Sequence, residues 1–213
     1  MKVALIGATG YVGSKILAEA LNRGHEVTAI VKNVDKLPQH AKLTGKSADV
    51  FKDAELAQVL AGHEAVITAY SPGIANPDVR RLHGEAAQHI INATKAAKVP
   101  RLLAVGGAGS LEVTPGLEAV DTPDFPEQWK GGALGTRDVR NLLREEKDLD
   151  WSFLSPSAML QPGQRTGTFR LGGSKMLFDA KGESHISVED YAVALIDELE
   201  KPQHSRQQFT VGY

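Results

Sequence analysis

The sequence predicts an α/β protein built on a doubly wound parallel sheet, and two observations support this. From residue 2 to residue 105, short apolar runs typical of buried parallel strands alternate with segments whose apolar residues recur at helical spacing. Such alternation is typical of strand–helix–strand units with right-handed crossovers. The first apolar run also ends in a glycine-rich turn that opens a helix, an order typical of nucleotide-binding units. The length suffices for a sizeable core, and we expect a single domain over residues 1–213.

The first strand, turn and helix contain the most specific motif of the chain. After the apolar run 2–6, Gly7, Gly10 and Gly13 follow in the spacing Gly-x-x-Gly-x-x-Gly. Gly7 permits a tight turn, Gly10 lets the main chain approach a pyrophosphate, and Gly13 allows close helix–strand packing. Free N–H groups and the dipole at the helix start favour a phosphate. An ordinary glycine turn is the alternative. We expect a dinucleotide site formed by the whole turn, that is by Gly7, Ala8, Thr9, Gly10, Tyr11, Val12 and Gly13.

The second strand, expected over residues 26–31, ends at a basic residue. In dinucleotide sites an acidic side chain near this point binds the ribose 2′-hydroxyl of NAD, whereas a basic one accommodates the 2′-phosphate of NADP. Here Lys32 follows the strand, and the nearest acid, Asp35, comes three residues later in a predicted helical turn. A solvated surface lysine is the alternative, and Lys lacks the bidentate fork of Arg. We therefore expect NADP(H) to be preferred over NAD(H).

The next elements continue the alternation. We expect a third strand of poor pattern, a helix, a fourth strand, a long helix opened by Asn76-Pro77-Asp78, and a fifth strand, at residues 41–46, 53–61, 64–69, 76–98 and 101–105 respectively. Ligands of open parallel sheets lie at the carboxyl ends of strands. Ala69, Tyr70 and Ser71, at the end of the fourth strand, are therefore further candidates for cofactor binding.

The alternation lapses after residue 110, which divides the chain into a nucleotide half, about residues 1–110, and a substrate-side half, about residues 111–213. We expect a proline-rich loop, a helix, a strand, a glycine-rich excursion and a short hairpin strand at residues 112–132, 134–147, 151–155, 161–173 and 178–182 respectively. Ser187 then opens a helix to about residue 200 with a capping-box pattern, and a final strand follows at 207–211. Long loops inside compact domains are usually functional, so we expect this small elaboration to form the substrate pocket.

Composition disfavours several functions. The formal net charge of −2 gives no electrostatic reason to expect nucleic acid or an anionic membrane as a partner. The chain has no cysteine and no pair of histidines at i, i+4 spacing, so we expect no disulfide and no metal site. No stretch approaches the roughly 20 apolar residues of a membrane span, and no signal-peptide pattern is present. We therefore expect a cytoplasmic protein.

These motifs resemble those of a known superfamily. The glycine spacing, with Thr9 and Tyr11, is similar to that of the atypical and extended short-chain dehydrogenases/reductases. Within that superfamily the chain looks most like the small NmrA-like proteins known as NADH-flavin reductases, and more distantly like biliverdin reductase B. Further similarities along the chain include the runs 105–110, 155–158 and 165–167. The resemblance covers essentially the full length.

The resemblance implies a Rossmann-type fold and further cofactor contacts. In the family, the residues that correspond to Asp49 and Val50 lie along the adenine ring. The strand end that corresponds to residues 69–71 lines the ribose and nicotinamide. Oxidoreductase activity with a nicotinamide cofactor is the function that the resemblance implies.

One element of the superfamily is missing from this sequence. Most members reduce carbonyls with a Tyr-x-x-x-Lys pair, whose tyrosine donates the proton. Only Tyr11 has a lysine, Lys15, four residues later, and because Tyr11 lies on the phosphate turn we interpret this match as coincidence. Trp129 stands where the family's tyrosine would fall. We therefore expect hydride delivery to an acceptor that needs no proton donor from the protein, such as a flavin or quinone, with water supplying the proton.

Three residues are candidates for substrate binding, and each has a plainer alternative. Ser110 could hydrogen-bond a substrate or cap the glycine-rich loop. Trp129 could stack on an isoalloxazine ring or only cover the pocket, and we favour the second. Arg165, with Arg170, could hold an anionic acceptor or be an ordinary surface arginine. Asp190 we assign to helix capping and not to catalysis.

Two function classes remain open from the sequence. The first, which we favour, is an NADPH-dependent oxidoreductase that acts on a flavin, a quinone or a similar planar acceptor. The second is a non-catalytic nucleotide sensor of the NmrA kind, which binds the cofactor and signals its occupancy to a partner protein. Epimerase or dehydratase chemistry on nucleotide sugars is disfavoured by the missing tyrosine and the small C-terminal half.

Overall fold

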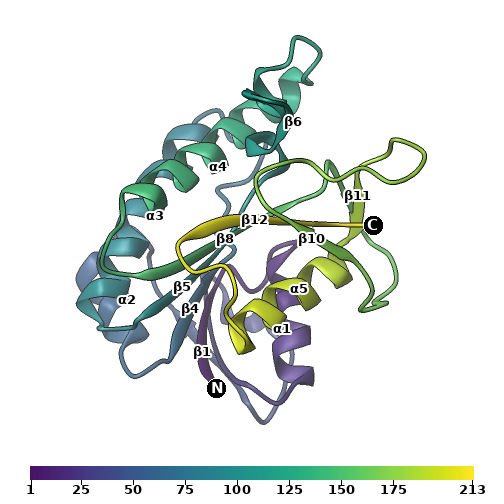
Figure 1. The fold of residues 1–213 in the computed structure, drawn as a ribbon. Helices are drawn as coiled ribbons and strands as arrows, with labels where there is room; N and C mark the ends of the chain where they lie inside the picture. The colour runs from purple at the N-terminus through teal and green to yellow at the C-terminus, as the bar shows by residue number, and fades with distance from the viewer.

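The computed structural model describes residues 1–213 and confirms the α/β prediction, because a mostly parallel sheet lies between two layers of helices (Figure 1). Every neighbouring pair of strands in this sheet is parallel except the pair of β10 with β12. In spatial order the eight strands are β10 (Arg170–Gly172), β12 (Gln207–Gly212), β8 (Asp150–Pro156), β5 (Arg101–Val105), β4 (Ala65–Thr68), β1 (Lys2–Ile6), β2 (Glu26–Val31) and β3 (Leu43–Ser47).

Five helices cover the two faces of the sheet. One face is covered by α1 (Gly13–Asn22) and α5 (Val188–Glu200), and the other by α2 (Asp53–Leu60), α3 (Val79–Ala96) and α4 (Glu127–Glu145). None of these helices is both long and apolar enough to span a membrane. The strand order reverses at β1, which lies between β2 and β4. The carboxyl ends of β1 and β4 therefore form the switch point at which such sheets bind ligands.

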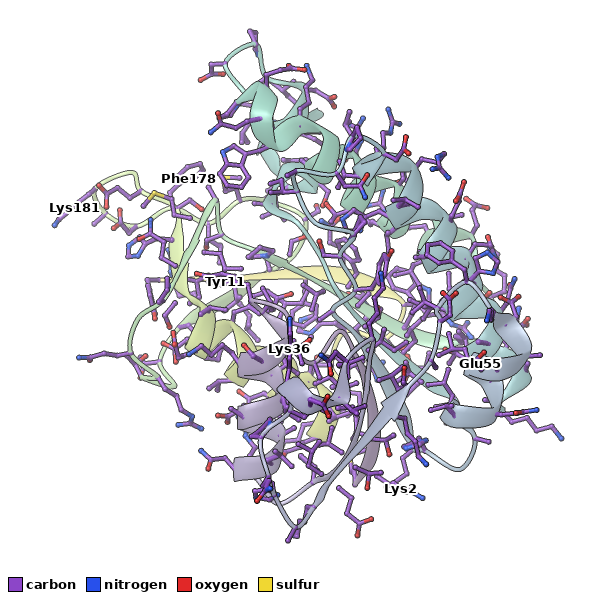
Figure 2. The ribbon with its side chains drawn as sticks, turned by 180° about the vertical axis from the view of Figure 1, so that it is seen from behind. Lys2, Tyr11, Lys36, Glu55, Phe178 and Lys181 are labelled. Atoms are coloured by element: carbon purple, nitrogen blue, oxygen red, sulfur yellow. The ribbon has the colours of Figure 1, made fainter.

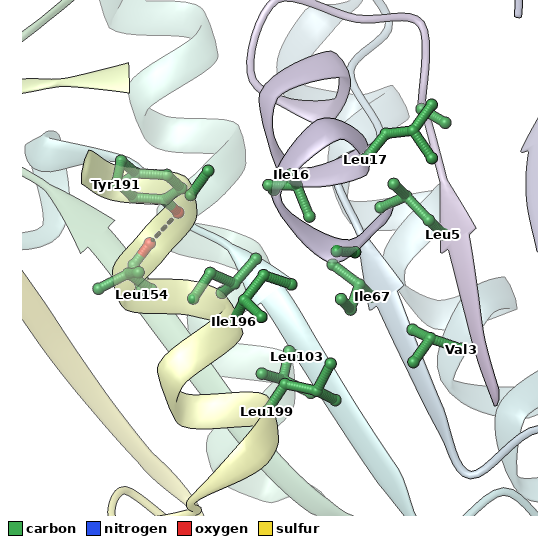
Figure 3. Close-up of a cluster of buried hydrophobic side chains, with 14 of the residues drawn as sticks. Val3, Leu5, Ile16, Leu17, Ile67, Leu103, Leu154, Tyr191, Ile196 and Leu199 are labelled. Atoms are coloured by element: carbon green, nitrogen blue, oxygen red, sulfur yellow. Dashed lines mark hydrogen bonds between the residues drawn. The ribbon is translucent and has the colours of Figure 1, made fainter. Parts of the chain in front are cut away.

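The central strands are mostly apolar because both of their faces are buried. Alternate residues of a strand point to opposite faces. In β1, Val3 and Leu5 belong to the cluster under α1 and α5, whereas Ala4 and Ile6 belong to the cluster under α2, α3 and α4. Figure 3 shows the first cluster, in which the buried hydroxyl of Tyr191 donates to a main-chain carbonyl of β8 at 2.7 Å. Burial on both sides explains the continuous apolar runs of the sequence.

The nucleotide half follows the predicted order of elements. β1, β2 and β5 have the predicted bounds, and a short 3-10 turn, η1 (Val34–Lys36), lies between β2 and β3. The start of α3 differs, since the helix begins at Val79 and not at Asn76. The Oδ1 atom of Asn76 accepts the N–H of Asp78 at 2.9 Å, so Asn76 closes a turn before the helix instead of capping it.

The segment predicted as a proline-rich loop, residues 112–132, contains regular structure. It forms the hairpin of β6 (Glu112–Thr114) and β7 (Leu117–Glu118), the turn η3 (Ala119–Asp121) and the first residues of α4, which begins at Glu127 and not at residue 134. Glycines concealed this part of the helix in the sequence. Gly131 and Gly135 lie against α3, where an added Cβ would be 2.9 Å from the nearest side-chain atom. Glycine stands at these positions because α3 is too close for a side chain. The segment therefore lacks the apolar residues at helical spacing by which a helix is recognised in a sequence.

The strand predicted at residues 178–182 is wrong, because this segment forms a turn. One carboxylate oxygen of Asp179 accepts the N–H groups of Lys181 and Glu183, at 2.8 and 2.9 Å, and closes the turn. The strand comes after it, as β11 (His185–Ser187), and pairs in parallel with β9 (Met159–Gln161). Ser187 caps α5 as predicted, since its Oγ accepts the N–H of Asp190 at 3.0 Å.

Candidate functional site

The turn from Gly7 to Gly13 joins β1 to α1 at the switch point of the sheet. Gly7 has a φ of +81°, and an added Cβ there would lie 2.6 Å from the carbonyl oxygen of Ala69 at the end of β4. At Gly13 an added Cβ would lie 2.0 Å from the carbonyl oxygen of Gly7. These two glycines let the turn pack against β4. Gly10 differs, because an added Cβ would meet only the Gly7 carbonyl, at 3.3 Å, so its outer side is open to a ligand.

Main-chain donors at the start of α1 face this open side. The first helical bond runs from the N–H of Ser14 to the carbonyl of Gly10, at 2.9 Å. The N–H groups of Tyr11, Val12 and Gly13 donate to no acceptor of the chain. No acidic residue lies in the first turn of α1. Free N–H donors together with the positive end of the helix dipole fit a pyrophosphate, which is the group that the predicted site requires.

Lys32 is the first residue after β2, and its side chain is exposed. The lysines that form ion pairs with carboxylates are Lys15, Lys52, Lys95 and Lys130. The ammonium of Lys32 therefore has no carboxylate partner. Asp35 lies in η1, where its N–H donates to Oδ1 of Asn33 at 2.9 Å. Lys36 of η1 is also exposed, on the same face as Tyr11 (Figure 2). The carboxyl end of β2 therefore carries an exposed lysine whose ammonium has no carboxylate partner.

Asp49 and Val50, the residues that the resemblance assigns to the adenine side, follow β3. Asp49 is exposed, and its Oδ1 accepts the N–H of Phe51 at 3.1 Å, so the carboxylate orders the turn that enters α2. Val50 is buried and belongs to the apolar cluster under α2 and α3. The structure thus places the side chain of Val50 in the core and that of Asp49 at the surface.

Residues 69–71 lie at the carboxyl end of β4, beside the glycine turn. The N–H of Ala69 donates to the carbonyl of Ile6 at 2.9 Å, which ties this segment to the end of β1. The ring of Tyr70 is half-buried and stands edge-on to the rings of Phe51 and His83, with centroids 6.2 and 6.4 Å away. Burial, and secondarily a nearby carboxylate charge, raise the pKa of Tyr70, so its hydroxyl stays protonated at neutral pH.

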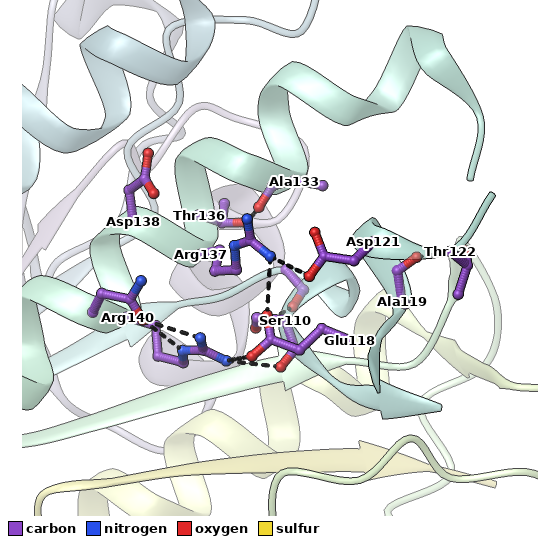
Figure 4. A network of polar contacts seen from close by, with 12 residues as sticks. Ser110, Glu118, Ala119, Asp121, Thr122, Ala133, Thr136, Arg137, Asp138 and Arg140 are labelled. Atoms are coloured by element: carbon purple, nitrogen blue, oxygen red, sulfur yellow. Dashed lines mark hydrogen bonds and ion pairs between the residues drawn. The ribbon is translucent and has the colours of Figure 1, made fainter. Parts of the chain in front are cut away.

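Ser110 lies in the short helix η2 (Ala108–Ser110) after β5 and is almost fully buried. Its hydroxyl donates to the carbonyl of Gly107 at 3.1 Å and accepts from Nε2 of Gln208 at 3.0 Å. Its carbonyl accepts from Nη1 of Arg140 at 2.9 Å, and Arg140 is ion-paired with Glu118 at 2.7 Å (Figure 4). The side chain is thus engaged inside the protein, but it does not cap η2, whose N-cap residue is Gly107.

Trp129 and Arg165 lie in different parts of the substrate-side half. Trp129 is in the first turn of α4 and is 50% exposed. Arg165, in the segment between β9 and β10, donates two hydrogen bonds to the carboxylate of Glu19 on α1, each of 2.7 Å. Hydrogen bonds from Arg165 and then Arg23 hold the pKa of the buried Glu19 below its ordinary value, although burial opposes this. Arg165 therefore fixes its segment to α1.

Asp190 has a role beyond the capping that the sequence predicted. Its buried carboxylate accepts from the N–H and the hydroxyl of Thr166, at 2.8 and 2.6 Å, from the N–H of Gly167 at 2.8 Å, and from the hydroxyl of Tyr213 at 2.6 Å. Burial opposes ionisation, but these hydrogen bonds outweigh it and lower the pKa of Asp190. The sequence contained a signal for this role, because Asp replaces the usual Glu of the capping box and is too short to return a bond to the N-cap.

One cluster of three side chains has the residue types of a metal site. Asp179, Glu183 and His185 place one potential ligand atom each within 4.8 Å of one another. Asp179 already accepts two main-chain N–H groups, and His185 contacts its second carboxylate oxygen at 3.2 Å. These contacts explain the cluster as part of the turn before β11.

Comparisons with known proteins agree with the geometry of the glycine turn. Residues 7–202 match the model of a family described as NAD(P)H-binding. The uncharacterized protein YwnB of Bacillus subtilis is 42% identical over 214 residues, and the alignment covers 99% of this chain and 98% of that protein.

Two solved structures share the fold over the full length of the chain. A protein from Bacteroides thetaiotaomicron, provisionally named an epimerase, is 46% identical with a TM-score of 0.93, and the match covers 100% of this chain and 96% of that one. A protein from Streptococcus pneumoniae, provisionally named an NADH-flavin reductase, is 37% identical with a TM-score of 0.88, covering 100% and 99%. The two names describe different chemistry, so the fold alone does not select the reaction.

Proposed function

The chain belongs to the NAD(P)H-binding family, and we propose that it is an NADPH-dependent oxidoreductase that reduces a flavin, a quinone or a similar planar acceptor. The observation that carries this proposal is the open glycine turn at the switch point, with its free main-chain donors. The bound nicotinamide would supply a hydride, so that NADPH loses two electrons, the acceptor gains them, and water supplies the second hydrogen as a proton.

The chain's own residues would bind and orient the cofactor along the carboxyl edge of the sheet. The N–H groups of Tyr11, Val12 and Gly13 would bind the pyrophosphate, and the missing side chain of Gly10 would admit it. Residues 69–71 lie beside this turn, at the next strand end, where the ribose and nicotinamide would follow. In this proposal the hydride donor would lie between the ends of β4 and β5.

The preference for NADPH over NADH rests on Lys32. Its unpaired ammonium lies at the carboxyl end of β2, which is the position that distinguishes the two cofactors in sheets of this topology. A hydrogen bond to a charged group is worth about 1.5–3 kcal/mol. We therefore propose a preference of roughly 10- to 100-fold.

We propose this class of acceptor because the tyrosine hydroxyls near the carboxyl edge of the sheet are not paired with a lysine. The hydroxyl of Tyr11 donates to a main-chain carbonyl of β9 at 3.3 Å, while Lys15 is paired with Glu189 at 3.0 Å, so these two residues do not act as a Tyr–Lys pair. Tyr70 has no lysine four residues later. Without a proton donor, the chain would contribute binding, orientation and exclusion of water. This suits acceptors that take hydride readily. Flavin, which appears in the provisional name of the Streptococcus pneumoniae protein, is an acceptor of this class.

The experiment is steady-state loss of NADPH absorbance over a panel of acceptors. FMN, riboflavin and simple quinones should oxidise NADPH measurably, whereas ketones and aldehydes should not, and secondary alcohols should not reduce NADP⁺. Turnover of a ketone that disappears in Tyr11→Phe or Tyr70→Phe would refute the mechanism. Tight NADPH binding without turnover of any acceptor would support a non-catalytic sensor instead.

A further inference from the structure

Exposed apolar side chains gather at the carboxyl edge of the central strands. Eight large apolar side chains of the chain are exposed. Five of them lie in the connections that leave five neighbouring strands, namely Val34 after β2, Tyr11 after β1, Ile74 after β4, Trp129 after β5 and Met159 after β8. Single exposed apolar residues are ordinary, but a group of them at one edge indicates a binding surface. Val34 lies on the proposed adenine side, and we refer to the other four residues as the apolar rim.

The helical register of α4 places Trp129 above the loop that follows β5. Ala133 packs against Gly109, and Thr136 packs against Gly107, since an added Cβ on these glycines would lie 2.7 and 2.4 Å from the two side chains. Ala133 and Thr136 come four and seven residues after Trp129 and therefore share its helical face. Ala133 and Thr136 on this face contact the loop. Trp129 lies one turn closer to the start of the helix and is half-exposed. Trp129 therefore lies at the end of α4 that adjoins the loop after β5, at the carboxyl edge of the sheet.

The other rim residues lie on both sides of this position. Ile74 comes from the β4 connection and lies near α4, where an added Cβ on Gly132 would be 3.9 Å from it. Tyr11 lies on the cofactor turn and donates to the carbonyl of Leu160, the residue after Met159. The rim therefore consists of Ile74 with Trp129 on the α4 side and Tyr11 with Met159 on the β9 side. The proposed path of the nicotinamide runs between them, at the ends of β4 and β5.

Given the proposed function, on which this inference rests, we infer that Trp129 stacks on the acceptor and selects planar aromatic acceptors. The acceptor ring would lie with one face toward the nicotinamide and the other toward the indole. Two properties of Trp129 favour this role over a covering role. It is half-exposed, so part of the indole is accessible to a ligand, and its helix is fixed to the β5 loop by packing and by the bond from Arg140 to the Ser110 carbonyl. A partly exposed indole on an anchored helix is a stacking surface that costs little entropy on binding.

The test is a titration of riboflavin with the protein saturated with NADP⁺, which binds the cofactor site without turnover. Contact with an indole quenches flavin fluorescence, so the parent protein should quench it on binding. Trp129→Ala should remove the quenching and weaken riboflavin binding by about 5- to 150-fold, because stacking on an aromatic side chain is worth about 1–3 kcal/mol. Trp129→Phe should retain most of the affinity with less quenching. The dissociation constant for NADP⁺ should not change in either variant.

Leu171→Ala is the matched control. Leu171 is an apolar residue of similar exposure, 45% against 50%, but it lies on the edge strand β10. This variant should bind riboflavin as the parent does. The inference is overturned if Trp129→Ala binds riboflavin with unchanged affinity, or if the parent protein does not bind riboflavin at all. Failure of the proposed function is a separate result, since it would appear as absence of NADPH binding or oxidation whatever residue stands at position 129.

Discussion

Replacing Gly10 with Val tests the cofactor site most directly. The fold should tolerate the change, because an added Cβ would meet only the Gly7 carbonyl, at 3.3 Å. The rest of the side chain would project into the space in front of the N–H groups of Tyr11, Val12 and Gly13. Each hydrogen bond to a phosphate is worth about 1.5–3 kcal/mol. Loss of two of the three would raise the dissociation constant for NADPH roughly 150- to 25,000-fold.

The assay is titration of NADPH fluorescence, with the thermal unfolding midpoint measured on the same samples. Gly173→Val is the matched control, since an added Cβ there has no atom within 4 Å, and it should bind NADPH as the parent does. Gly13→Ala should behave differently from both, because its Cβ would lie 2.0 Å from the Gly7 carbonyl and should destabilise the protein by about 1–3 kcal/mol. A folded Gly10→Val protein with unchanged NADPH affinity would show that the pyrophosphate lies elsewhere.

Three further predictions concern single side chains. Lys32→Glu should erase or reverse the preference for NADPH, measured as the ratio of the dissociation constants of NADPH and NADH, and equal constants in the parent would show that Lys32 is only a surface residue. Tyr11→Phe and Tyr70→Phe should each keep most of the turnover with a quinone, measured by NADPH absorbance, because neither is a proton donor in this mechanism; a large loss in either would contradict it. Asp190→Asn should lower the free energy of unfolding at pH 7 by about 1.5–3 kcal/mol, since charge-assisted hydrogen bonds are lost. Because the pKa of Asp190 is lowered by folding, its stabilisation is present above the ordinary carboxyl pKa and is lost as the pH falls through the lowered value, so urea unfolding should show the difference between parent and variant shrinking in acid.

The nucleotide half could be predicted from sequence because its signals are local. Each central strand is apolar on both faces, as the division of Val3 and Ala4 between the two clusters illustrates, so it forms a continuous run. The glycine turn is also local, since Gly13 and its partner atom on Gly7 are six residues apart. The start of α4 could not be found in this way. Its glycines were selected by contact with α3, a neighbour that no periodicity within the segment indicates.

The substrate-side half depends on contacts between residues that are distant in sequence. Arg165 meets Glu19 across 146 positions, and Ser110 meets Gln208 across 98. The sequence shows that these side chains are polar, but it does not show which residues they contact. Both candidates could therefore be proposed as substrate contacts from the sequence, whereas the structure engages their side chains within the protein. Trp129 differs because the structure leaves it half-exposed.

These long-range contacts also bear on how the proposed acceptors would be distinguished. Glu19 and Asp190 are buried carboxylates, and both accept charge-assisted hydrogen bonds from the segment between β9 and β10. These charge-assisted hydrogen bonds to buried carboxylates hold the segment in place before any ligand binds. It is held on α1, whose N-terminus carries the free main-chain donors, and on α5, which contains Asp190. In the proposed site this segment is therefore not a closing lid, and we propose that exposed rim residues such as Trp129 select the acceptor.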